Sequence, residues 1–190
     1  MKFFEMRENI KKLILPFYRL YRSFLLYIYN YWLTRLPVYW VRKLYLNYVL
    51  KISVGRKSFV HMGCFFYPGK IIIGDNSVIG RDCHFLGTIT IKNNVSITAK
   101  TYIFTVTHYK DDAAFGVFDT PVIIEDYAWV GAKAMILPGV KIGRGAILGA
   151  ASTATKSVPD YAVFVGAPAR QVGVRSREIS YKLDYFPYFE

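Results

Sequence analysis

The chain has 190 residues, the size of one ordinary domain and enough to bury a substantial core. A hydrophobic fraction of 53% and a mean hydropathy of +0.22 exclude a disordered chain. Two cysteines, Cys64 and Cys83, are too few for a disulfide scaffold and form no CxxC pair. We expect packed thiols in a reducing, cytoplasmic compartment, because the charged start of the chain does not look like a signal peptide.

The formal charge of +12 is unevenly distributed along the chain. Residues 1–51 hold ten Lys and Arg against two Asp and Glu, a net +8, which leaves +4 for the other 139 residues. The same segment carries 14 of the 33 Phe, Trp and Tyr. The chain therefore divides into a basic, aromatic arm (1–51), a more balanced body (52–170) and a C-terminal tail (171–190).

Residues 10–50 are predicted to form one or two helices, broken at Pro16 and Pro37. The longest run without a charge is the 12 residues 23–34, whereas a bilayer-spanning helix needs about 20 apolar residues. Cations interleaved with aromatic residues suit peripheral contact with an anionic membrane. A helical cap over the end of the body, or a contact between subunits, explains the arm equally well. No nucleic-acid-binding module is recognisable, so we expect no such partner.

The body carries a repeat with a period of six, which neither an α-helix nor a simple strand alternation produces. Three hexads per turn would build a triangular coil of short strands and corners, an all-β parallel solenoid. The interior positions are large and apolar: Ile73, Ile79, Phe85, Ile91, Ile97, Ile103, Ile124, Val130, Ile136, Ile142 and Leu148, with Val54, Val60 and Phe66 upstream.

A second series lies four residues after each interior position and is mostly small or β-branched, as a tight corner would require. Its members are Ser77, Cys83, Ile89, Val95, Thr101, Thr107, Ala128, Ala134, Val140, Ala146 and Ser152. Glycine directly follows the interior residue at five places, where we expect little room or an unusual φ. These are Gly74, Gly80, Gly131, Gly143 and Gly149.

Three motifs near the end of the body carry a family resemblance. They are a W-V-G block (129–131), an I-x-P-G-V-x-I-G block (136–143) and a G-x-P-A-R terminus (166–170). With the hexads, they resemble the hexapeptide-repeat acyltransferase superfamily across roughly residues 52–170, and most closely its maltose/galactoside and polysaccharide O-acetyltransferase branch. The resemblance implies a left-handed parallel β-helix, a homotrimer with sites between subunits, acetyl-CoA as co-substrate and no metal.

Residues 104–121 interrupt the period and are predicted to form the active-site loop. The resemblance implies that His108, at the root of this loop, is the general base that takes the proton of an attacking hydroxyl. Asp111, Asp112 and Asp119 are loop candidates for the acid that orients it, and Asp111 is also a candidate for substrate binding. His84 is expected to line the acceptor end of the cleft.

Three histidines raise the alternative of a zinc-dependent carbonic anhydrase on the same scaffold. Their spacings of 23 and 24 residues do not stack three imidazoles on one face, as a tetrahedral site would need.

The resemblance also implies a set of acetyl-CoA contacts. Trp129 and Ala132 match positions beside the acetyl and pantetheine arm, and Ala150, Thr155 and Lys156 match further contacts along it. Arg170 matches a basic residue near the nucleotide phosphates. Simple repeat packing explains the two alanines equally well.

The resulting hypothesis is an O-acetyltransferase that transfers acetyl directly from acetyl-CoA to a sugar hydroxyl of a bacterial glycan or its precursor. The aromatic arm favours an acceptor carried on a lipid. Acetylation of an antibiotic or another small molecule is one alternative, and a non-catalytic solenoid used as an assembly subunit is another.

Overall fold

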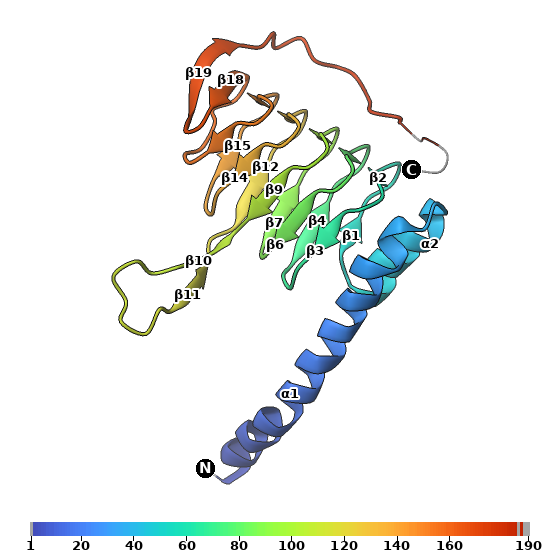
Figure 1. Ribbon diagram of the computed structural model, residues 1–190, viewed down its shortest axis with the longest axis vertical. Coiled ribbons are helices and arrows are strands. Elements are labelled where there is room, and N and C mark those ends of the chain that lie inside the picture. The colour runs from blue at the N-terminus through green and yellow to red at the C-terminus, as the bar shows by residue number, and fades with distance from the viewer. Residues whose placement is uncertain (1, 186, 188–190) are drawn as a thin grey trace.

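The computed structural model describes residues 2–185 and 187, with side-chain burial described from residue 14 onward. It shows a parallel β-solenoid with a helical segment at its N-terminal end (Figure 1). The fold class predicted from the repeat, a parallel solenoid with an N-terminal helical segment, is confirmed.

The solenoid has three faces, and each is a sheet in which every coil contributes one strand. Face 1 holds β1 (Ser53–Val54), β4 (Ile71–Ile73), β7 (Ile89–Ile91), β12 (Val122–Ile124) and β15 (Lys141–Ile142). Face 2 holds β2 (Phe59–Val60), β5 (Val78–Ile79), β8 (Ser96–Ile97), β13 (Trp129–Val130), β16 (Ile147–Leu148), β18 (Ala162–Gly166) and β19 (Ala169–Val174). Face 3 holds β3 (Phe65–Phe66), β6 (His84–Leu86), β9 (Tyr102–Phe104), β14 (Met135–Ile136) and β17 (Thr153–Ala154).

The period of six places the core correctly. Every predicted interior residue from Val54 to Leu148 is buried, and those from Ile73 onward are at most 1% exposed. The small series is buried as well, with Thr107 as the exception. Thr107 is only half-buried because the chain has already left the coil at that point.

The five glycines that follow interior residues are explained by lack of room and not by an unusual φ. A Cβ at Gly80 would lie 2.5 Å from the backbone nitrogen of Ala99, and one at Gly143 would lie 2.5 Å from that of Asp160. None of the five has a positive φ. Positive φ falls two residues later in the turn, for example at Asn76 and Asp82.

The arm consists of α1 (Lys2–Tyr31), a 3₁₀ turn η1 (Leu33–Arg35), α2 (Tyr39–Leu44) and a π-helical turn η2 (Tyr45–Val49). The predicted break at Pro16 is wrong, because α1 runs through this residue. Proline removes one backbone hydrogen bond from a helix but does not have to end it. Among the described residues, no helix combines the length and apolar character that crossing a membrane requires.

The second half of the arm covers the first coil. Asn30 bonds the backbone of Phe66 with both its amide atoms, at 2.8 and 3.0 Å. The Tyr39 hydroxyl donates to the carbonyl of Ser58 at 2.6 Å. Leu26, Tyr29 and Leu46 join the same buried cluster as the solenoid interior. The open end of the core is therefore sealed by side chains of the arm.

The expected loop is a β-hairpin that projects from the solenoid at the corner between faces 3 and 1 (Figure 1). Its strands β10 (Val106–His108) and β11 (Val117–Asp119) pair antiparallel. At its root the Asp119 carboxylate accepts hydrogen bonds from the hydroxyls of Thr88, at 2.6 Å, and Thr105. Burial alone would raise the pKa of Asp119, but these hydrogen bonds outweigh it and lower that pKa below its ordinary value.

The chain ends differently from the expected simple tail. β19 extends to Val174, so the first four residues of segment 171–190 belong to a strand that pairs antiparallel with β18. The rest then runs back along the solenoid towards its N-terminal end (Figure 1). Arg175 donates to the carbonyl of Tyr127 at 3.0 Å, and Asp184 lies 3.6 Å from Lys57. The tail thus contacts coils from the last to the first.

Replacing Gly80 with alanine should destabilise the solenoid by about 1–3 kcal/mol, because the new Cβ meets backbone that cannot move without disturbing the ladder. Gly173→Ala is the matched control, since its nearest neighbour would be Val163 at 4.0 Å. Denaturant unfolding of both variants measures the difference. Equal stabilities would show that coil spacing does not exclude a side chain here.

Asp119→Asn should lower the free energy of unfolding by about 1 kcal/mol at neutral pH, a figure discounted for the exposure of this side chain. The folded pKa is depressed, so the contribution is present above the unfolded pKa and disappears as pH falls through the folded value. Wild type and variant should therefore converge in acid when unfolding is measured from pH 7 downward. A gap that persists below both pKa values would contradict this account, and Asp111→Asn serves as an exposed control.

Candidate functional site

His108 is the last residue of β10, and its ring is fixed by the opposite side of the hairpin. Its Nδ1 lies 2.9 Å from the carbonyl oxygen of Phe115, and the two rings stack with centroids 3.7 Å apart. A carbonyl can only accept a hydrogen bond, so Nδ1 must carry the proton. In the neutral ring Nε2 then holds the lone pair, which is the state that a general base needs.

The three acidic residues of the hairpin have partners other than His108. Asp111 pairs with Lys110 at 3.0 Å, and Asp112 accepts from the backbone N–H groups of Ala114 and Gly116, which lower its pKa. Asp119 is engaged by the two threonine hydroxyls at the root. The His108 ring is therefore oriented by the backbone carbonyl of Phe115, whereas the sequence suggested an acidic side chain in this role. No side-chain pattern could have indicated it, because every residue has a carbonyl.

His84 lies on face 3, in an outward-facing column of flat rings. It stacks on Tyr102 with centroids 4.8 Å apart and on Phe65 at 5.6 Å, and its Nδ1 is 3.5 Å from the Tyr67 hydroxyl. Desolvation lowers the pKa of His84, which favours the neutral ring. The column leads into the hairpin, because β9, which carries Tyr102, ends at Phe104. The sequence analysis did not identify this column. Its rings are nevertheless about one coil apart in the sequence, since His84 follows Phe65 by 19 residues and Tyr102 follows His84 by 18.

The small residues expected beside acetyl-CoA form a column at the corner between faces 2 and 3. Ala132 and Ala150 occupy the same position in consecutive coils, and the Ala151 N–H donates to the Ala132 carbonyl at 2.8 Å. Trp129 is on face 2 and is 47% exposed, with its Nε1 3.3 Å from the Thr98 hydroxyl. An exposed indole therefore lies beside a corner at which the side chains of Ala132 and Ala150 are small.

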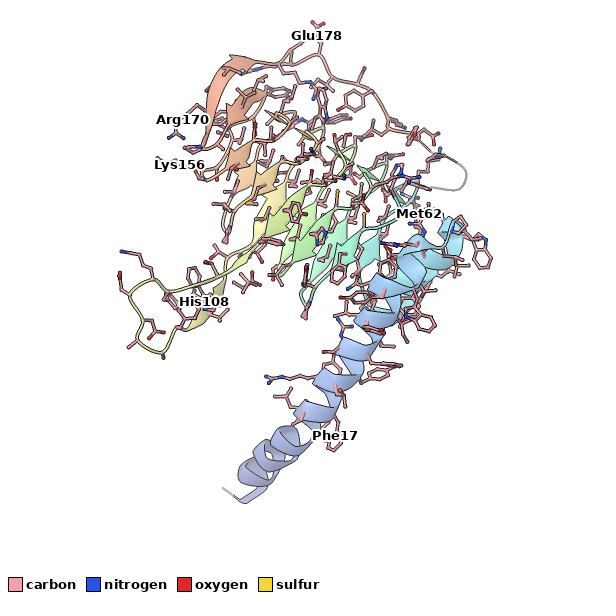
Figure 2. All side chains as sticks on the ribbon, viewed as in Figure 1. Phe17, Met62, His108, Lys156, Arg170 and Glu178 are labelled. Atoms are coloured by element: carbon pink, nitrogen blue, oxygen red, sulfur yellow. The ribbon has the colours of Figure 1, made fainter. Side chains whose placement is uncertain are left out.

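The basic residues of the predicted set lie near the C-terminal end of the solenoid. Thr155 and Lys156 follow β17 at the corner between faces 3 and 1, which is also the corner where the hairpin leaves two coils earlier. Arg170 is the second residue of β19 and pairs with Val165 of β18. All three are exposed. Figure 2 shows Lys156 and Arg170 at the edge of the solenoid, well apart from His108 on its hairpin.

The structure therefore gathers most of the predicted residues around one flank, which consists of face 3 and its two corners. His84 is on the face itself, the two alanines line one corner, and Lys156 and the root of the His108 hairpin share the other. Within a single chain, His108 and the cations do not form one compact pocket (Figure 2). Across residues 2–185 and 187, no group of three or more His, Cys, Asp or Glu is gathered as a metal site would need.

Comparisons with known proteins agree with the solenoid fold. Residues 121–156 match the family model for the bacterial transferase hexapeptide (six repeats). WcaF of Escherichia coli K12, named as an acetyltransferase of colanic acid biosynthesis, is 36% identical over 113 residues, which are 58% of this chain and 61% of WcaF. The chain thus spans less than two thirds of the length of this curated relative.

Solved structures extend the likeness to most of the chain. A maltose O-acetyltransferase from Clostridium difficile 630 superposes with a TM-score of 0.68 at 29% identity, covering 84% of this chain and 87% of that one. AntD, an N-acyltransferase from Bacillus cereus in complex with dTDP and 3-hydroxybutyryl-CoA, superposes with a TM-score of 0.61 at 26% identity, covering 67% and 74%. Residues 121–156 thus carry the bacterial transferase hexapeptide repeat, and in its period, corners and motifs the chain is similar to the hexapeptide-repeat acyltransferases.

Proposed function

We propose that this protein is an acetyl-CoA-dependent O-acetyltransferase whose acceptor is a sugar hydroxyl of a glycan or its precursor. The observation that carries the proposal is the hydrogen bond from His108 Nδ1 to the Phe115 carbonyl, which leaves Nε2 free to accept a proton. A histidine held in this tautomer, on a hairpin that interrupts an otherwise regular solenoid, is positioned for general base catalysis.

The proposed reaction is a direct transfer. Nε2 of His108 takes the proton of the acceptor hydroxyl while the oxygen attacks the thioester carbonyl carbon. The tetrahedral intermediate collapses, the carbon–sulfur bond breaks, and the imidazolium returns the proton to the departing thiolate. Both cysteines, Cys64 and Cys83, are fully buried in the core, so neither can form an acyl-enzyme in this fold.

The chemistry of the flank suits acetyl-CoA. The exposed Lys156 and Arg170 can meet phosphates with charge-assisted hydrogen bonds, and the column of Ala132 and Ala150 leaves space for the pantetheine arm. AntD, a neighbour in fold, was solved with an acyl-CoA. Trp129 would pack against the same arm.

The separation of His108 from the cations supports a homotrimer in which one subunit supplies the hairpin and its neighbour the coenzyme-binding corner (Figure 2). Flat solenoid faces suit this arrangement. The names of WcaF and the maltose enzyme favour a carbohydrate acceptor, with His84 and Asp111 as its proposed contacts. A lipid-linked acceptor and membrane contact through residues 1–51 stay predictions.

AntD provides a specific reason to consider a second acceptor class. It is an N-acyltransferase solved with dTDP, which suggests an amine on a nucleotide-linked compound as a second acceptor class to test. An acceptor panel should therefore include nucleotide-linked amino sugars beside neutral sugars, glycan fragments and antibiotics. The acceptor that gives the highest kcat/KM distinguishes these classes.

His108→Asn should lower kcat by about 10²–10⁴-fold, because asparagine can still donate to the Phe115 carbonyl but offers no basic nitrogen. Acceptor-dependent release of free thiol from acetyl-CoA measures the rate. Lys110→Arg, an exposed change on the same hairpin that keeps the positive charge beside Asp111, should retain activity. A His108→Asn enzyme that matches wild type would remove the proposed base, and a wild type without any thiol release would favour the non-catalytic assembly subunit.

Lys156→Ala and Arg170→Ala should each raise the KM for acetyl-CoA about tenfold and leave kcat within a factor of a few, because each loses a charge-assisted contact to phosphate. The increase in KM should be smaller at high salt, because salt screens the interaction of exposed charges with phosphate. Lys92→Ala, an exposed lysine that follows β7 on face 1, is the matched control. Unchanged KM values for both variants would show that the coenzyme does not bind at this corner.

A further inference from the structure

Helix α1 carries a stripe of large apolar residues with alternating spacings of three and four. The described members are Phe17, Leu20, Phe24, Tyr27 and Tyr31, which we call the seam. In the sequence the same step extends back to Phe3, Met6, Ile10 and Leu13. This is the a/d pattern of a coiled coil, sustained over four heptads.

The seam is not covered by its own chain. Phe17 and Leu20 are each 70% exposed, and the least exposed seam residue, Tyr27, is 50% exposed. The opposite side of the helix faces the protein, since Leu26 and Tyr29 are buried in the core cluster. Figure 1 shows α1 extending well beyond the solenoid. An exposed apolar stripe of this size on a soluble fold marks an interaction surface.

Three cations of the arm are engaged in contacts within the chain. Arg22, across the helix from the seam, donates to the carbonyl of Leu50 at 3.0 Å. Arg42 is fully buried and donates to the carbonyl of Val60 at 2.8 Å, and Lys43 donates to that of Gly55 at 2.6 Å. These three side chains are engaged within the chain, whereas Arg19 of α1 is exposed, so the choice of a helical partner rests on the heptad spacing of the seam and is tested against lipid below.

The seam is also continuous with the flank described above. At its C-terminal end the ring of Tyr31 packs edge-on against Phe65, with centroids 5.6 Å apart. Phe65 is in turn the first ring of the aromatic column on face 3 that contains His84.

We propose that the seam pairs with the same seam of a second copy of this chain, in a parallel coiled coil. Cyclic symmetry brings like positions of one helix together, so Phe24 of one copy would face Phe24 of the next. The pairing would hold subunits together independently of the solenoid faces. This inference goes beyond acetyl transfer and does not depend on it.

Thiol cross-linking of the full chain tests the pairing directly. Phe24→Cys places a cysteine in the seam, and Tyr18→Cys places one outside the seam, at parent side chains of similar exposure, 58% and 54%. The native thiols of Cys64 and Cys83 are buried and should not react. Under mild oxidation at low protein concentration, Phe24→Cys should give about tenfold more disulfide-linked dimer than Tyr18→Cys.

Two further measurements keep the result interpretable. Each variant is checked for wild-type circular dichroism, and wild type and Phe24→Glu are tested for sedimentation with phosphatidylglycerol vesicles. Equal cross-linking at the two positions would contradict the proposed pairing of helices through the seam. Weak cross-linking at Phe24, together with vesicle binding that Phe24→Glu abolishes, would instead assign the stripe to lipid. Thiol release from acetyl-CoA by the same preparations reports on the proposed reaction separately.

Discussion

The distance between stacked coils is the constraint on which the rest of the structure depends. Parallel ladders hold neighbouring backbones about 4.8 Å apart, and hydrogen bonds such as Gly131 N–H to the Leu148 carbonyl, at 2.7 Å, repeat this spacing along every face. At that distance the backbone of the next coil leaves no space for a side chain at some positions directly after a strand, such as Gly80 and Gly143, whereas the interior position meets its own equivalent in the next coil. Glycine after the strand and a large apolar residue within it are two consequences of one spacing.

The same spacing explains how a site can be assembled from residues far apart in the sequence. Corners line up in columns, so a hairpin inserted after β9 leaves the solenoid beneath Thr155 although about fifty residues separate them. The insertion disturbs no neighbour, because β12 pairs directly with β7 and continues face 1 as if the hairpin were absent. Asp119 and two threonines close the gap at its root. A regular solenoid can therefore carry an irregular functional element at little structural cost.

What the sequence could predict follows from this division. Positions such as Ile97 and Ala146 lie in a repeated environment, so their burial was predictable from the period alone. The hairpin strands were not, since they occur once, and the partner of His108 is a carbonyl that leaves no trace in the sequence. The path of the tail could not be predicted either. Arg175 and Tyr181 donate hydrogen bonds to the backbone carbonyl of Tyr127, and a backbone carbonyl gives no sign in the sequence of which side chain will bind it. Predictability ended where the repeat ended.

Two periods in one chain also imply two kinds of surface. The period of six is fully satisfied within the molecule, since its interior residues are buried by neighbouring coils. The period of seven in α1 is not, because the end of a solenoid is flat and can bury only one side of a helix that crosses it. Tyr29 and Leu26 fill that contact, and Phe24 and Leu20 remain outside it. The pairing proposed above would give this exposed side a partner with the same period, namely another copy of the same helix.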